Sequence, residues 1–342
     1  METMQAAVLV APRRFELREV PVPDVGPGDA LIRVDRCGIC GTDIHMFNGH
    51  YAAESLPIIP GHELTGRVAK LGDAVRGLAL GQRVVADINI GCGHCFFCRR
   101  NEVLNCAEVR QAGISRDGAF AEYMALPARL VIPAPETVPA AELALVEPVA
   151  CVVRAARKAR AGFAQSVVVL GAGPIGNLHI QMMRLVGAAP ILAIELSPER
   201  AKFAKDAGAD IVVTDPTQAL TAVREATGGR GADIVIESVG SARLYAQALE
   251  LVRPGGHVSA FGITGPDDRL ALPILRTVLD ELGIKGSVAA MGEDMHDALT
   301  LVGHGRFDLS LFTGASFPLA EIQQAFETLG ERPGDLKTQI TI

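Results

Sequence analysis

The sequence predicts an α/β protein in which a doubly wound parallel sheet is joined to a separate β-rich domain. Between about residues 147 and 287, short apolar strands alternate with helical segments, a pattern typical of a parallel sheet with helices on both faces. A glycine-rich turn follows the first of these strands. In the first 145 residues, Gly and Pro instead separate short strand signals, which indicates a mostly β domain. A length of 342 residues suits two such domains.

The expected elements follow one another in a simple order. The β-rich part is expected to contain the strands AAVLV, ALIRVD, LTGRVAKL and QRVVAD. A helix is expected over EPVACVVRAARKAR, followed by the strands SVVVLG, PILAIEL, DIVVT, ADIVIESVG and GGHVSAFG with a helix between each pair. The first of these helices should run from Pro174 to Val186. After IKGSVA the pattern becomes irregular, and it ends in an expected helix, Leu319–Thr328, and a last strand, KTQITI.

Composition excludes several classes of function. The net charge of −7 argues against nucleic acid or a lipid surface as partner, and a chain without Trp and with only 3 Tyr has little aromatic surface for stacking on bases. No apolar run approaches the ~20 residues needed to span a bilayer. The segment METMQAAVLVAPRRF does not resemble a signal peptide. With an odd number of cysteines, 7, of which four are clustered, we expect a reduced, cytoplasmic protein.

The cysteine cluster is the most specific motif in the chain. Its members are spaced C-x2-C-x2-C-x7-C in a glycine-broken loop, and they are Cys92, Cys95, Cys98 and Cys106. Thiolates this close in sequence can converge on one tetrahedral metal ion. The segment has neither helical nor strand periodicity, so a bound Zn²⁺ would have to fold it. A disulfide pair would need an oxidising compartment, and an iron–sulfur cluster is the other alternative that takes four cysteines.

A second motif predicts a dinucleotide site. VVVLGAGPIG places G-x-G-x-x-G directly after an apolar strand and at a helix start, so that the helix N-terminus faces a pyrophosphate. The cofactor-binding residues expected here are Gly171, Gly173, Pro174, Ile175 and Gly176. Glu195 ends the next strand, where a carboxylate can bind both adenosine ribose hydroxyls and repel a 2′-phosphate, so NAD is favoured over NADP. Arg200, five residues later, could approach a 2′-phosphate, or it could be an exposed helix arginine.

Two upstream segments carry candidate ligands for a catalytic metal. CGICGTDIH contains Cys37, Cys40, Thr42, Asp43 and His45, and PGHELTG contains His62 and Glu63. A thiolate and an imidazole from different segments are typical ligands of a catalytic zinc, which keeps one position open. The alternatives are that Cys40 is a small buried hydrophobe and that His62 is a core histidine.

At this point the chain resembles the zinc-dependent medium-chain alcohol and polyol dehydrogenases, nearly end to end. The resemblance depends on GICGTDIH at 38–45, PGHE at 60–63, the cysteine cluster, DGAFAEY at 117–123, EP at 147–148 and GAGPIG at 171–176. Within that family the chain is most similar to the sorbitol, threonine and butanediol dehydrogenase branch. The resemblance implies a GroES-like β-rich catalytic domain over 1–150 and 288–342, with a structural zinc lobe at 91–107, and a Rossmann NAD-binding domain over 151–287.

The resemblance also implies roles for individual residues. Cys40, His62 and Glu147 would be the catalytic zinc ligands, with Glu63 as the competing candidate for the third ligand. If Glu63 is that ligand, Glu147 would hold the zinc-bound water. Asp43 would orient a ligand.

The proton route and the cofactor contacts are implied in the same way. Zinc would lower the pKa of the substrate hydroxyl, and the alkoxide would then expel hydride to the nicotinamide. Thr42 would accept the proton, and His45, which should titrate at roughly pH 6.5, would pass it to solvent through a cofactor ribose hydroxyl. The alternative for both is loop capping and surface exposure. Lys337 would lie near the cofactor pyrophosphate or be an exposed strand lysine.

The function expected from the resemblance is reversible NAD-dependent oxidation of a secondary alcohol in a polyol, diol or sugar-derived metabolite. The substrate cleft is expected between the domains, lined in part by Phe47 and Phe120. An Arg–Tyr pair that sorbitol enzymes carry is replaced here by Ala289–Ala290, which puts sorbitol itself in doubt. A threonine 3-dehydrogenase-like enzyme and a non-catalytic NAD-binding protein are the alternatives. A homodimer or homotetramer is expected.

Overall fold

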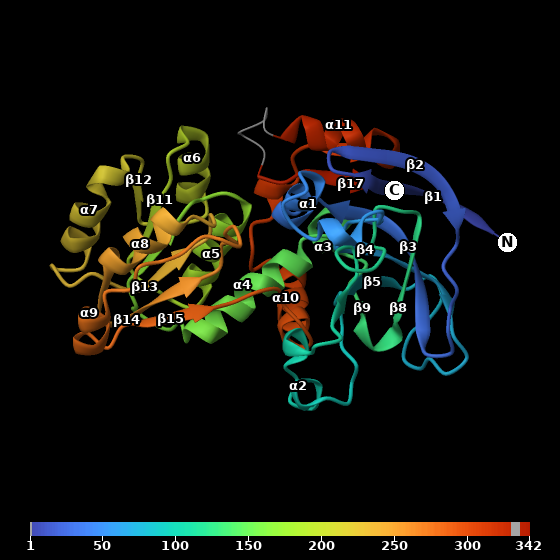
Figure 1. Cartoon of the computed structure of the whole chain (residues 1–342), viewed down its shortest axis with the longest axis horizontal. Helices are drawn as coiled ribbons and strands as arrows, with labels where there is room; N and C mark the ends of the chain where they lie inside the picture. The colour runs from blue at the N-terminus through green and yellow to red at the C-terminus, as the bar shows by residue number, and fades with distance from the viewer. Residues whose placement is uncertain (1, 330–335) are drawn as a thin grey trace. The chain divides into compact units, whose positions relative to one another are not determined.

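The computed structural model describes residues 2–329 and 336–342, which fold into two compact units (Figure 1). The first unit comprises Met1–Ala150, Ala290–Gly305 and Phe312–Ile342. The second comprises Cys151–Ala289 and Arg306–Leu311. The chain therefore leaves the first unit after Ala150, builds most of the second, returns at Ala290, and contributes to the second unit again over Arg306–Leu311.

The first unit is built around a seven-stranded sheet of order β16-β17-β3-β4-β5-β9, in which β8 also pairs with β3. Its strands are β3 (Asp29–Gly38), β4 (Glu63–Leu71), β5 (Arg83–Ala86), β8 (Tyr123–Pro127), β9 (Val131–Pro133), β16 (Ser316–Pro318) and β17 (Gln339–Thr341). Two smaller sheets pair β1 (Thr3–Ala11) with β2 (Arg14–Pro21) and β6 (Asn89–Ile90) with β7 (Arg110–Gln111). Its helices are α1 (Gly41–Phe47), α2 (Phe96–Arg99), α3 (Ala140–Leu143), α10 (Glu293–Gly303) and α11 (Ile322–Glu327).

An aromatic cluster closes one part of this core. Phe326 of α11 lies 5.1 Å from Phe47 and 6.0 Å from Phe120, measured between ring centroids. Phe47 is 3% exposed and Phe120 fully buried. The prediction that these two rings line a substrate cleft is therefore wrong. The sequence gives no sign of this, because α11, the helix that covers both rings, comes far later in the chain than either of them.

The second unit contains a six-stranded parallel sheet of order β12-β11-β10-β13-β14-β15. Its strands are β10 (Val167–Leu170), β11 (Ile191–Ile194), β12 (Ile211–Val213), β13 (Ala232–Glu237), β14 (Val252–Ala260) and β15 (Gly283–Gly286). Its helices are α5 (Pro174–Leu185), α6 (Pro198–Asp206), α7 (Ala219–Ala226), α8 (Ala242–Leu251) and α9 (Ile274–Leu279), and α4 (Val146–Ala159) leads into it from the first unit.

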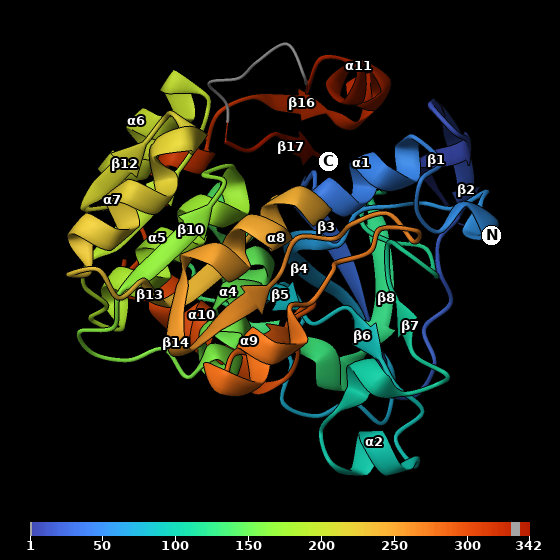
Figure 2. The same cartoon turned by 60° about the vertical axis from the view of Figure 1, so that its left-hand side comes forward.

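The strand order explains where this sheet can bind a ligand. The chain runs outward from β10 through α5 to β11, and then returns to the other side of β10 to form β13 and β14 (Figure 2). Right-handed crossovers in opposite directions place α5 and α8 on opposite faces. The carboxyl ends of β10 and β13 thus flank the point where the order reverses, which is where doubly wound sheets bind ligands. This is the α/β architecture that the sequence predicts.

Membrane insertion through a helix finds no support in the fold: within residues 2–329 and 336–342, no helix is long and apolar enough to cross a bilayer.

Candidate functional site

Three candidate metal ligands from two segments meet in the first unit. Ligand atoms of Cys40, His62 and Glu63 all lie within 4.8 Å of one another. Cys40 is the residue before α1, whereas His62 and Glu63 lie at the start of β4. The antiparallel register of β3 and β4 pairs Gly38 with Glu63 and so brings the two segments together. The cluster therefore follows directly from the pairing of two neighbouring strands.

A buried carboxylate orients this cluster. Asp43, 1% exposed, accepts hydrogen bonds from the backbone amides of Cys40 (2.8 Å) and Gly61 (3.3 Å). Its Oδ1 also lies 3.4 Å from Nδ1 of His62. Burial lowers the pKa of His62, but the Asp43 carboxylate and Cys40 more than offset this and leave the pKa well above its usual value. A thiol, an imidazole and carboxylates gathered at one point form a set of donors that suits a metal cation.

Lys337 reaches the same cluster from the returning C-terminal segment. Its Nζ donates to Oε1 of Glu63 at 2.6 Å and also pairs with Oε2. Both side chains are buried, and although burial lowers the pKa of Lys337, the Glu63 carboxylate raises it above its usual value. Lys337 is thus not the exposed strand lysine that the sequence allowed. Its predicted contact with a pyrophosphate stays a prediction.

The other predicted catalytic residues are not members of this cluster. Glu147 lies in the first turn of α4 and is 8% exposed, but among the described residues it is not part of the cluster of Cys40, His62 and Glu63. Thr42 is half-buried on α1, and His45, one turn later, is exposed. The predicted proton route through Thr42 and His45 stays a prediction.

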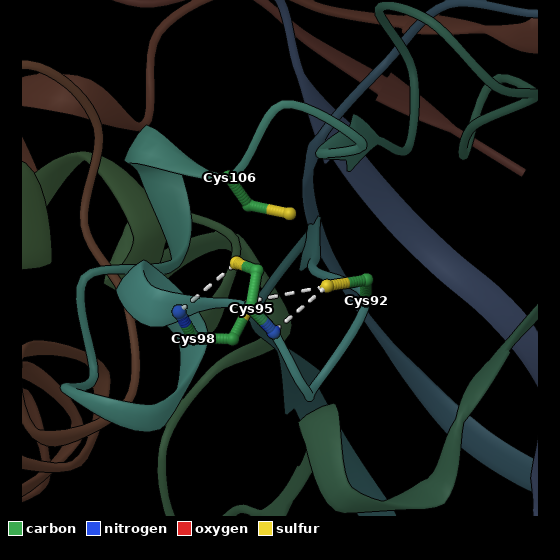
Figure 3. Close-up of side chains that lie close together, drawn as sticks. All are labelled: Cys92, Cys95, Cys98 and Cys106. Atoms are coloured by element: carbon green, nitrogen blue, oxygen red, sulfur yellow. Dashed lines mark hydrogen bonds between the residues drawn. The ribbon is translucent and has the colours of Figure 1, made fainter.

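The four clustered cysteines converge on one small space (Figure 3). Their sulfur atoms lie within 4.8 Å of one another. Backbone amides of Cys95 and Cys98 donate to the sulfurs of Cys92 and Cys95, both at 3.4 Å. The surrounding loop contains only the short helix α2 and a 3₁₀ turn at Val103–Asn105, and it exposes Phe96 by 67%. The loop therefore has no apolar core of its own.

The chemistry of this cluster fits a metal rather than disulfides. None of the seven cysteines, all of which lie in the described part of the chain, forms a disulfide. The Gly93 amide lowers the pKa of Cys98, but burial and the three neighbouring cysteines raise it, to about 12. Four thiolates can therefore share this space only if a cation compensates their charge, as in structural zinc sites. His94 is exposed, with Cys92 and Glu108 nearby, as expected of a residue outside the four-sulfur set.

The glycine-rich turn has the geometry expected of a dinucleotide site. Gly171 has a φ of +86°, and a Cβ on Gly176 would overlap the Gly171 carbonyl oxygen. Gly173 precedes α5, whose first residue is Pro174 and second is Ile175. The turn therefore brings backbone amides and a helix N-terminus to one point at the carboxyl end of β10.

The carboxylate of Glu195 lies directly against this turn. Its Oε2 accepts a hydrogen bond from Ala172 N at 2.7 Å, and its Oε1 accepts one from Ser197 N at 2.9 Å. The Arg200 guanidinium lies 3.9 Å from where a Cβ on Gly173 would be. An acidic group that favours NAD and a basic group that could reach a 2′-phosphate thus lie beside the same turn.

Sequence reasoning missed one residue of this site. Ser238, which follows β13, donates its hydroxyl to the carbonyl oxygens of Leu170 (2.8 Å) and Gly171 (3.1 Å). A small polar residue directly after a buried strand is the signal that could have found it.

Comparisons with known proteins show which family the chain is similar to. Residues 26–136 match the family model described as alcohol dehydrogenase GroES-like domain, and residues 174–303 match zinc-binding dehydrogenase. The chain is 33% identical to erythritol/L-threitol dehydrogenase of Mycolicibacterium smegmatis, over 99% of this chain and 98% of that protein. It is 32% identical to L-threonine 3-dehydrogenase of Chromobacterium violaceum, over 94% and 95% of the two chains.

A solved structure is similar along its whole length. It is a Sinorhizobium meliloti 1021 protein described as a zinc-binding dehydrogenase bound to NADP, with a TM-score of 0.92, 30% identity and 100% coverage of both chains. Together with the two family models, this similarity confirms the predicted fold class, a GroES-like domain joined to a Rossmann sheet.

Proposed function

Because the chain belongs to the zinc-dependent medium-chain dehydrogenases, we propose that it transfers hydride between NAD and a secondary alcohol of a polyol, diol or sugar-derived metabolite. The observation that carries this proposal is the joint presence of the Cys40–His62–Glu63 cluster and the Gly171–Gly176 turn. A polyol enzyme is preferred because a relative over the full length is named for tetritol substrates.

In this proposal Cys40, His62 and Glu63 hold the catalytic zinc, which when bound polarises the hydroxyl of the substrate. Asp43 keeps the ligands oriented through its amide contacts. Thr42 accepts the hydroxyl proton, and the exposed imidazole of His45 passes it to water. Cys92, Cys95, Cys98 and Cys106 hold a second, structural zinc.

The grouping of Glu63 with Cys40 and His62 favours Glu63 over Glu147 as the third ligand. Glu63→Gln should remove about one zinc per chain and most of the activity, because the amide is a weaker ligand than a carboxylate. Glu147→Gln should keep both zinc ions while lowering turnover. Metal content and kcat of the two variants decide the matter, and loss of zinc from Glu147→Gln alone would assign the ligand to Glu147.

The cofactor preference depends on Glu195. Glu195→Ala should lower kcat/KM for NAD by about tenfold, because the variant loses the ribose contacts and no longer repels a 2′-phosphate. The kcat/KM for NADP should stay level or rise, since Arg200 remains beside the turn. Steady-state kinetics with both cofactors measure this, and Arg200→Ala is the matched control. Equal losses for NAD and NADP in Glu195→Ala would contradict the assignment.

The experiment that tests the proposal is an NADH-absorbance screen across polyols, vicinal diols and threonine, with the zinc content measured on the same protein. Turnover of a polyol or diol with two zinc ions per chain supports it. Turnover of threonine alone would favour the hydroxy amino acid alternative, which a full-length relative named for threonine keeps open. Tight NAD binding without hydride transfer to any alcohol would indicate a non-catalytic protein.

We also propose a homo-oligomer, formed through the outer edge of the parallel sheet. No described strand pairs with the outer side of β15. Next to it, α9 exposes a row of aliphatic side chains: Ile274 64%, Leu275 74%, Val278 68% and Leu279 72%. An unpaired edge strand beside a large apolar surface favours association with another chain. A twofold axis would place β15 and α9 of a second copy against the same elements of the first.

Charged substitutions should dissociate this oligomer. Leu275→Glu combined with Val278→Glu should reduce the mass measured by light scattering to that of a smaller assembly. Leu80→Glu is the control, because Leu80 is also 68% exposed but lies in a loop of the first unit. An unchanged mass in the double variant would place the interface elsewhere.

A further inference from the structure

A buried carboxylate at the end of β13 holds a loop in place. Glu237 is fully buried, and its Oε1 and Oε2 both lie 3.0 Å from Gly240 N. Oε1 also accepts hydrogen bonds from Val239 N at 3.1 Å and Ser241 N at 3.4 Å. Three successive backbone amides thus point at one side chain. None of the roles assigned above uses it.

The same residue binds a second loop, at the end of β14. The Glu237 carbonyl oxygen accepts hydrogen bonds from Phe261 N (3.1 Å) and Gly262 N (2.9 Å). The hydroxyl of Tyr245 donates to the Gly262 carbonyl oxygen at 2.7 Å. A Cβ on Gly262 would overlap both Gly240 N and Oε2 of Glu237. The two loops, 238–241 and 261–263, are therefore packed backbone against backbone around this carboxylate.

Both loops lie at the edge where doubly wound sheets bind ligands. They follow β13 and β14 at the carboxyl edge, next to the glycine-rich turn after β10. Val239 packs so closely on Gly171 that a Cβ on Gly171 would overlap it. Val239 and Ile263 are 56% and 51% exposed, so two aliphatic side chains face outward at this edge. Apolar groups presented at this edge suit the flat rings of a dinucleotide.

We propose that Glu237 is a positioning residue for the cofactor: its carboxylate clasps loops 238–241 and 261–263 and so sets the shape of the dinucleotide site beside Gly171. This inference goes with the proposed function, since it assumes that the sheet binds a nicotinamide dinucleotide. Glu237 acts through Val239, Ile263 and the turn, and it does not touch the cofactor itself.

A carboxylate suits this position better than its amide. An ionised carboxyl group only accepts hydrogen bonds, and here at least three donors converge on it. A glutamine would keep one acceptor oxygen, but its NH₂ group would face backbone N–H donors. Hydrogen bonds to a charged acceptor are also the stronger kind. Glu237→Gln therefore weakens the hydrogen bonds that hold loop 238–241, with almost no change in side-chain volume.

The test compares Glu237→Gln with Asp233→Asn. Asp233 is an acidic residue of the same strand whose Oδ2 accepts hydrogen bonds from Ser166 N (2.8 Å) and Ser166 Oγ (2.6 Å), and it also pairs with Arg253. It lies at the amino end of β13, away from the glycine-rich turn. Both variants lose a carboxylate that binds backbone, so both should lower the melting temperature. Only Glu237→Gln should affect the cofactor.

We expect Glu237→Gln to raise the Kd for NAD by about tenfold while kcat at saturating NAD changes less than about twofold. In the free protein, hydrogen exchange at Val239, Gly240 and Ser241 should accelerate by at least about tenfold. Asp233→Asn should leave both the Kd and these amides within about twofold of wild type. The split between Kd and kcat is a readout that a general loss of stability does not produce.

Two results would overturn the role of Glu237. One is wild-type affinity for NAD in Glu237→Gln, and the other is an equal loss of affinity in Asp233→Asn. If the wild-type chain bound neither NAD nor NADP, the proposed function itself would fail, and this role with it. If wild type and Glu237→Gln bound NAD equally well, only the positioning role of Glu237 would fail, and the proposed function would stand.

Discussion

Replacing Cys40 with serine is expected to lower turnover by more than a hundredfold and to remove about one zinc per chain. Even changes in the outer partners of metal ligands typically cost about 10- to 100-fold in metal affinity or activity, so the loss of a thiolate ligand should cost more. Cofactor binding should be nearly unchanged, because the glycine-rich turn is built by separate strands. Metal content, kcat and NAD titration on one preparation measure the three quantities.

The matched control is Cys37→Ala. Cys37 is three residues earlier and fully buried, but it is not part of the group formed by Cys40, His62 and Glu63. This variant should lose stability by creating a small cavity, while it keeps its zinc. If Cys40→Ser retained wild-type kcat, the zinc mechanism would be wrong.

Local sequence patterns were sufficient to predict the strands and the first helix of the second unit. The helix expected over Pro174–Val186 is α5, Pro174–Leu185, and each expected parallel strand is present. This succeeded because a buried parallel strand is a continuous apolar run, and because Pro174 and Gly173 mark a helix start. Glu195 could be placed beside the turn for the same reason, since neighbouring parallel strands end at the same edge.

The first unit shows what sequence alone could not supply. Its site combines residues that are distant along the chain: β17 pairs with β3, with Ile340 opposite Cys37, and this places Lys337 on Glu63 across 274 residues. No periodicity encodes such a pairing. The choice between Glu63 and Glu147 stayed open for the same reason, because adjacency to His62 says nothing about which carboxylate faces the thiolate. The prediction that Phe47 and Phe120 line a cleft was wrong because α11, which packs over both rings through Phe326, comes so late in the chain.

The second large effect is expected from Cys106→Ala, which should unfold the loop that contains the four cysteines. Binding of a structural zinc contributes about 10 to 16 kcal/mol in zinc-finger peptides, and here that binding has to replace an apolar core. With Cys106 absent, the site has three sulfurs, and the free energy of unfolding of the loop should fall to about zero. Arg99 and Arg100, both exposed, would then lie in unfolded chain.

Limited trypsin digestion makes this unfolding visible. Cys106→Ala should be cut after Arg99 or Arg100 at least about tenfold faster than wild type, because cleavage requires several residues of extended chain. It should contain one zinc per chain instead of two and keep NAD binding, since its defect is confined to the loop. Cys151→Ala, which changes a buried thiol at the start of the second unit, is the control and should be cut like wild type. Resistance of Cys106→Ala to trypsin, with both zinc ions retained, would mean that protein contacts alone fold the loop, and the structural zinc would have to be abandoned.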